Sequence, residues 1–149
     1  MRPILRRVAF ALALGGVPSL GAQRQAAAGN EVVVIVNAGN HVESLTAADV
    51  SKVFLRKKTK WPDGRAIQPV DQIETSPVRR RFSDDLLRMD VPSVKGFWQE
   101  IVFSGRGEPP PERVSDADVI AYVKANPNAV GYVLRSAASA DVNIITITK

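Results

Sequence analysis

The residues with the clearest chemistry lie around the Ser76-Pro77 pair. A serine followed by proline is typical of a helix start, because the hydroxyl accepts from free first-turn amides and proline needs no amide hydrogen there. The start of a helix is also electropositive, and Arg79 adds a guanidinium in the first turn. A cap hydroxyl, free amides and an arginine are together the donors that a small oxyanion requires.

This pattern gives the first hypothesis, an oxyanion site at the start of a helix over 77–89. In it, Ser76 donates its hydroxyl, the amides of Val78 and Arg79 point at the ligand, and the Arg79 side chain neutralises its charge. Thr75 and Gln72 are secondary candidates for ligand binding. Phosphate is the preferred ligand.

The arginines of this helix also have an ordinary explanation. Arg80 has Asp84 at i+4, and Arg81 has Asp85 at the same spacing, so both can form surface ion pairs. Arg79 has no acid at that spacing, and the sequence therefore gives it no partner. The alternative to an anion site is a solvated basic face.

Other chemistry finds little support in this chain. There is no cysteine and the only histidine is His41, so no metal-ligand spacing exists. Ser76 lies in Thr-Ser-Pro, which is not a nucleophile elbow. The glycine-rich residues 105–107 lack the lysine-serine end of a phosphate-cradling loop. We therefore expect no enzyme activity, no metal and no cofactor.

The first residues have the pattern of a secretory signal. Three arginines precede an apolar run over 8–20 that is too short to span a bilayer. Ala22 is the preferred cleavage position, with Gly21 and residues 26–28 as alternatives. Removing residues 1–22 lowers the net charge from +5 by these three arginines to +2, so the basic pI gives no support for nucleic-acid binding. The sequence predicts an exported, periplasmic protein that does not span the membrane.

The remaining chain reads as a flexible lead-in over 23–30 and one α/β domain over 31–149, with no internal repeat. A β-branched run over 31–37 is typical of a strand buried on both faces. Strands are also expected over 67–70, 129–133 and 142–147, and helices over 45–54, 77–89, 94–102 and 115–125. Strands that alternate with helices indicate a sheet covered by helices, with ligands at the strand ends where helices begin.

The order of several landmarks resembles the PstS-like family of phosphate-binding periplasmic proteins. The matching segments are residues 54–58 with the Trp-Pro-Asp-Gly of 61–64, Ser76 with Phe82, and Asn-Pro-Asn-Ala-Val-Gly-Tyr-Val over 126–133. The resemblance implies the type 2 periplasmic-binding fold, in which two α/β lobes close on an oxyanion for an ABC transporter. Because such a clamshell needs about twice the usual single-domain length, the chain is expected to be one lobe with a mixed sheet flanked by helices.

The anion turn departs from the family pattern. Where the family reads Arg-x-Asp-Gly-Ser-Gly-Thr, this chain keeps only Ser76; Gln72 replaces the arginine, Pro77 removes an amide donor and Val78 removes a hydroxyl. Since an unpaired buried charge costs several kcal/mol, a lobe with these fewer donors is expected to bind weakly or to need a partner over the site.

Two functional hypotheses follow. The first is an exported binding protein for an oxyanion, with an ABC permease, a second lobe or a second copy as partner. The second is a lobe that has lost its ligand and acts as a protein-interaction module in the cell envelope, with the basic loop 56–60 at the contact.

Overall fold

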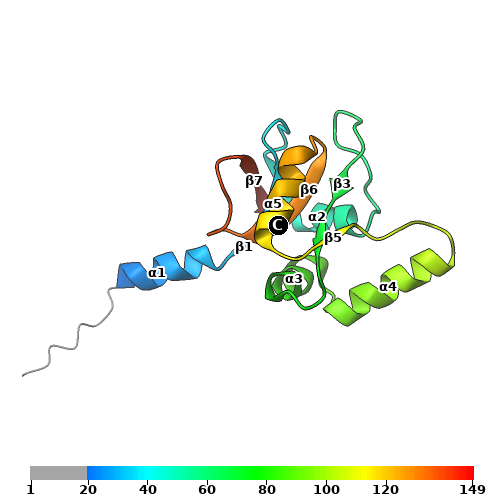
Figure 1. The fold of residues 1–149 in the computed structure, drawn as a ribbon, viewed down its shortest axis with the longest axis horizontal. Helices are drawn as coiled ribbons and strands as arrows, with labels where there is room; N and C mark the ends of the chain where they lie inside the picture. Colours follow the sequence, from blue (N-terminus) through cyan, green and yellow to red (C-terminus); the bar gives the residue numbers. More distant parts are fainter. Residues whose placement is uncertain (1–19) are drawn as a thin grey trace, which may run out of the picture.

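The computed structural model describes residues 20–149 (Figure 1), so most of the predicted signal sequence lies outside the described residues. Helix α1 (Leu20–Gly29) occupies the segment expected to be a flexible lead-in over 23–30. This segment is rich in alanine, the strongest helix former, which explains a helix with little tertiary packing. It extends away from the rest of the molecule (Figure 1). No helix within 20–149 is long and apolar enough to cross a bilayer.

A five-stranded mixed sheet forms the centre of the fold, in the order β2-β7-β1-β6-β3. The strands are β1 (Val32–Asn37), β2 (Ser44–Thr46), β3 (Gln68–Pro69), β6 (Ala129–Leu134) and β7 (Val142–Thr148). Strand β1 pairs antiparallel with β6 and β7, whereas β2 and β3 pair parallel with β7 and β6. The expected mixed α/β sheet is confirmed.

Strand β1 lies in the middle of the sheet and is buried on both faces, as its β-branched run predicts. Its side chains alternate between two cores. Val34 and Val36 join the larger apolar cluster, and Val33 and Ile35 join the smaller one. One continuous apolar strand therefore supplies both faces of the sheet.

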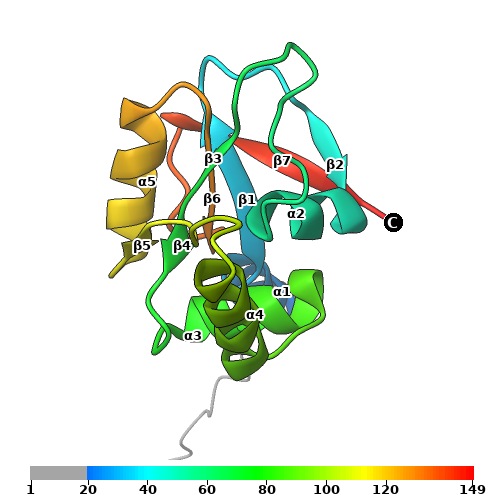
Figure 2. The same cartoon turned by 90° about the vertical axis from the view of Figure 1, so that its right-hand side faces the viewer.

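Helices cover the two faces of the sheet unequally. They are α2 (Ala47–Phe54), α3 (Pro77–Phe82), a π-helical turn η1 (Ser83–Leu87), α4 (Val91–Phe103) and α5 (Asp116–Ala125). Helix α5 packs on the smaller cluster through Val119 and Val123. The other helices pack on the larger cluster, where the rings of Phe82 and Tyr132 stack at 3.8 Å between centroids. Figure 2 shows α5 and α2 on opposite sides of β1.

Two expected elements differ from the structure. The single helix expected over 77–89 ends earlier, because α3 continues as the π-helical turn and Arg88 then takes a left-handed conformation (φ 56°). The helix expected over 94–102 spans Val91–Phe103 as α4, and its apolar side chains are only partly buried. Val94 and Trp98 are buried, while Val102 is 52% and Phe103 90% exposed. Helix α4 accordingly projects from the sheet layers (Figure 1).

A second, two-stranded sheet sits beside the start of α3. Strands β4 (Asp71–Gln72) and β5 (Glu112–Arg113) pair in parallel, with Asp71 opposite Glu112. The strand expected over 67–70 is correspondingly broken into β3 and β4 at Val70. This small sheet brings a chain segment of distant sequence against the candidate anion turn.

Candidate functional site

Ser76 caps helix α3, as its position before Pro77 predicts. Its Oγ accepts from the amides of Val78 and Arg79, both at 3.2 Å, and donates to Oε1 of Gln72 at 2.7 Å. The two amides expected to point at a ligand are therefore bound to the cap serine of their own helix. The hydroxyl proton expected for the ligand is also engaged.

Gln72 is brought to the cap but is fully occupied. Its side chain is 1% exposed, and its Nε2 donates to Oδ1 of Asp116 at 2.8 Å and to the carbonyl of Tyr132 at 3.0 Å. Together with the bond from Ser76, this ties α3, α5 and β6 to β4. Thr75, the other secondary candidate, is exposed on the turn.

Arg79 does reach the site, but the expectation that it has no acidic partner is wrong. Its side chain is buried, with Nη2 at 3.3 Å from Oδ2 of Asp71 and Nη1 at 2.5 Å from Oε1 of Glu112. Nη1 also donates to the carbonyl of Gln72. The acids come from β4 and β5, so the i+4 spacing rule could not find them.

The two pairs expected on the neighbouring arginines are also not formed in the described part of the chain. No ion pair joins Arg80 to Asp84 or Arg81 to Asp85; Arg81 instead donates to the carbonyl of Asn30 at 2.8 Å. Surface pairs of this kind contribute little, and nothing else in the fold depends on them.

Asp71 is held by a network that combines charge and hydrogen bonds. Its Oδ1 accepts from the hydroxyl of Tyr132 and, at 2.8 Å, from the amide of Gln72. Burial raises the pKa of Asp71, although Arg79 and the hydrogen bonds act in the opposite direction. Burial and the adjacent carboxylate of Asp71 also raise the pKa of the Tyr132 hydroxyl, which therefore stays protonated as a donor.

The electrostatics of the cluster do not favour an anion. Burial alone lowers the pKa of Arg79, but the carboxylates of Asp71 and Glu112 outweigh it and raise that pKa, so the guanidinium stays charged. One cation faces two acids, which leaves no unshared positive potential. Among the side-chain atoms of Ser76, Gln72, Arg79 and Asp71, Nε of Arg79 is buried without a hydrogen-bond partner.

A cavity of about 360 Å³ opens beside Arg79. Its charged lining consists of Arg79 with Asp71 and Glu112, and of Lys95 paired with Glu74 at 3.0 Å. Its apolar lining comes from α4 and from Pro109 and Pro110, through Trp98, Val102 and Phe103. The side chain of Glu112 is 44% exposed, so it forms the accessible edge of the cluster.

Sequence reasoning found Ser76, Val78, Arg79 and Gln72, which the structure brings together. It missed the acids Asp71, Glu112 and Asp116 and the hydroxyl of Tyr132. Asp71 directly follows the apolar run ending at Val70, and the end of a strand is a position where polar site residues are common, so its place in the sequence could have indicated it. Glu112 lies in a proline-rich segment with no pattern that indicates a site residue.

No protein-family model and no curated protein sequence matches the chain. Solved structures do match it in fold. An ABC-type phosphate transport receptor from Vibrio cholerae is 18% identical with a TM-score of 0.62, covering 78% of this chain and 45% of that one. A putative phosphate ABC transporter substrate-binding protein with bound phosphate from Clostridium perfringens is 18% identical with a TM-score of 0.63. The match covers 87% of this chain and 52% of that one.

PstS from Borrelia burgdorferi is 11% identical with a TM-score of 0.58, covering 85% of this chain and 54% of that protein. The chain thus spans about half the length of the solved structures that it matches. Its fold is that of a single lobe of PstS-like periplasmic binding proteins, as the sequence resemblance implies.

Proposed function

We propose that this chain, with the fold of one lobe of a PstS-like binding protein, acts as a protein-interaction module in the cell envelope and not as an oxyanion carrier. The observation that carries the proposal is the saturation of Arg79 by Asp71 and Glu112. The amides and hydroxyl of the same turn are bound to one another through Ser76.

The energetics support this choice. A phosphate at the turn would stand beside two carboxylates, and like charges in a poorly solvated site disfavour one another strongly. It would also have to replace the bonds that Ser76 makes to both amides. Because a dehydrated anion needs nearly all its oxygens bonded, one unpartnered Nε is too little to hold it.

The location and the partner are part of the proposal. The predicted signal over 1–22 supports export to the periplasm, and the partner that we propose is another protein, an ABC permease or a second copy. The exposed apolar end of α4 supports a protein contact, since exposed apolar patches mark interaction sites.

Oxyanion binding, with phosphate preferred and delivery to an ABC transporter, is the second candidate. It is favoured by Glu112, whose half-exposed side chain can turn away from Arg79 into solvent. Nη1 of Arg79 would then have one donor free toward the 360 Å³ cavity that its side chain lines. In this second function, the carboxylate of Glu112 occupies the place of the anion at Arg79 until the ligand displaces it.

Calorimetry with phosphate, sulfate and a neutral sugar separates the two candidates. We expect no binding by the wild type at millimolar concentration. Glu112→Gln removes one of the two carboxylates at Arg79 and tests whether that charge excludes the ion. Glu31→Gln is the matched control, because Glu31 is exposed, pairs with Arg135 and does not line the cavity. Phosphate binding by the wild type, unchanged in Glu31→Gln, would overturn the interaction proposal and support the second candidate.

A further inference from the structure

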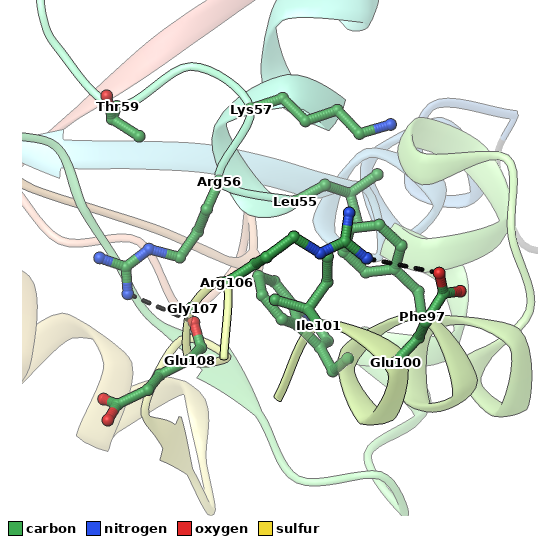
Figure 3. Close-up of a pocket in the computed structure, with 11 residues that line it drawn as sticks. Leu55, Arg56, Lys57, Thr59, Phe97, Glu100, Ile101, Arg106, Gly107 and Glu108 are labelled. Carbon is green, nitrogen blue, oxygen red and sulfur yellow. Dashed lines mark hydrogen bonds and ion pairs between the residues drawn. The ribbon is translucent and has the colours of Figure 1, made fainter. Parts of the chain in front are cut away.

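We infer that the groove between the ends of α2 and α4 is the contact surface of this lobe and takes an acidic segment of a partner protein that also carries apolar side chains. This inference rests on the proposed function and names the partner's chemistry. The groove, here called the basic groove, is drawn in Figure 3.

The size and floor of the basic groove fit a peptide segment better than a small ion. Its volume is about 710 Å³, and its floor includes Leu55 and Trp98, each 7% exposed, with Phe97 and Ile101 partly buried beside them. Phosphate has no apolar part to bury against such a floor. A chain segment with alternating side chains can fill it and keep its charges at the rim.

Helix ends place the cations at this rim. At the end of α2, the amide of Arg56 bonds to the carbonyl of Val53 at 3.0 Å, and that of Lys57 to the carbonyl of Lys52 at 2.7 Å. The amide of Arg106, just beyond the end of α4, likewise bonds to the carbonyl of Ile101 at 3.0 Å. These are the two-bond caps that close helices and fix the direction of the next side chains.

Arg56 is the unusual residue of these caps. It has a φ of 54°, in the left-handed region, where the corresponding residue after α4 is Gly105 with a φ of 67°. Glycine takes this conformation without steric penalty and is the usual residue there, whereas an arginine is strained. A strained backbone that presents a side chain to a cavity of about 710 Å³ points to a role for that side chain.

Two of the rim cations, Arg56 and Lys57, are weakly satisfied by the other residues of 20–149. Arg56 makes only a 3.5 Å bond to the carbonyl of Glu108, and Lys57 lies 5.7 Å from the ring centroid of Phe97. Neither has a carboxylate at ion-pair distance among residues 20–149. Nε of Arg106 donates to Oγ of Ser104 at 2.7 Å, and its Nη2 pairs with Glu100 at 3.4 Å in solvent (Figure 3). A partner's acid can replace this exposed ion pair.

Cations after a helix also offset its dipole, which explains charge at these positions in general. The helix dipole does not, however, explain why an arginine takes the left-handed conformation at position 56, or why the groove has an apolar floor. A nucleic acid would need a longer track of cations, and a bilayer would need a protruding surface, whereas this one is concave. An acidic, partly apolar peptide uses both features of the groove.

The test uses fluorescence anisotropy with a labelled peptide of alternating aspartate and leucine, and a lysine-leucine peptide of the same length as negative control. Arg56→Gly removes the cation and relieves the backbone, so we expect at least about tenfold weaker peptide binding, the effect of losing a desolvated charge contact. Arg88→Gly is the matched control, because Arg88 has a φ of 56° and does not line the groove.

Both glycine variants should raise the Tm, and only Arg56→Gly should lose binding. Equal affinity of the wild type and Arg56→Gly, or no binding of the acidic peptide to the wild type, would overturn the inference. Equal displacement of the peptide by single-stranded DNA or by vesicles with anionic lipid would also overturn it. The interaction function itself fails separately, if the wild type binds phosphate in the calorimetry above.

Discussion

Nη1 of Arg79 lies 2.5 Å from Oε1 of Glu112, although the two residues are 33 positions apart. The contact exists because β5 pairs with β4 next to the first turn of α3. Asp71 completes the arrangement from β4 itself. The lobe therefore carries its own negative groups at the turn where the sequence predicts an oxyanion.

Arg79→Ala should destabilise the fold by about 3–5 kcal/mol at neutral pH, because it leaves the buried carboxylate of Asp71 without its cation. Urea denaturation followed by circular dichroism measures this. The control is Arg80→Ala, an exposed neighbour on the same helix, with an expected change within about 0.5 kcal/mol. Equal effects of the two variants would contradict a buried ion-pair network.

Ser76→Ala should cost more than an ordinary helix cap. Ser76 bonds two amides and also donates to Gln72 in a buried position, so its loss should cost about 2 kcal/mol or more. Ser115→Ala removes the cap of α5 at an exposed position, with an expected cost of about 1 kcal/mol. Urea denaturation of both variants should therefore show a larger loss in the free energy of unfolding for Ser76→Ala than for Ser115→Ala.

Gly131→Ala should destabilise the sheet by about 1–3 kcal/mol through overpacking. A Cβ there would lie 2.6 Å from Cγ1 of Val119, on α5, and 2.9 Å from Cγ1 of Val70, both in the smaller apolar cluster. Gly96→Ala, inside α4, meets nothing within 4 Å and should instead stabilise by about 0.5–1 kcal/mol. Opposite shifts in thermal melting would bear out both assignments.

The contribution of Asp90 to the thermal stability of the fold should depend on pH. It caps α4 by accepting from the amide of Ser93 at 2.8 Å, and the hydrogen bonds from Ser93 hold its pKa below the ordinary 3.8. A carboxyl with a lowered folded pKa stabilises above its unfolded pKa and loses that effect as the pH falls through the folded pKa. Asp90→Ala should lower the Tm at neutral pH, with a gap that narrows below pH 3.8.

The control for this prediction is Asp90→Asn, which keeps a capping oxygen but cannot titrate. Its Tm should stay near that of the wild type at neutral pH. A gap between wild type and Asp90→Ala that is the same at acidic and neutral pH would show that ionisation of Asp90 plays no part.

Local signals in the sequence were sufficient for much of this fold. The caps Thr46, Ser76 and Ser115 each precede a helix in the structure, because capping depends only on neighbouring amides. The β-branched run of β1 predicts a central buried strand for a similarly local reason, since side-chain shape decides it. The single-lobe PstS-like fold, inferred from the order of short motifs, is confirmed by the solved structures.

The charge state of the site could not be predicted in this way. Whether Arg79 is free or paired depends on Glu112, which reaches it only through the pairing of two very short strands. Such strands carry no periodicity that a sequence can reveal. The exposure of the end of α4 is a further feature that the sequence does not predict. Apolar spacing shows which face of a helix is apolar, but not whether another segment covers it.

The position of β7 sets an order of events for folding. This strand, the last along the chain, lies between β2 and β1, and it pairs residues near 34–37 and 44–46 with residues beyond 140. The sheet thus cannot close on a partly synthesised chain, and contacts of such long sequence separation form slowly. Until residues 142–145 are available, the apolar β1 lacks one of its two neighbours and exposes an unpaired strand edge.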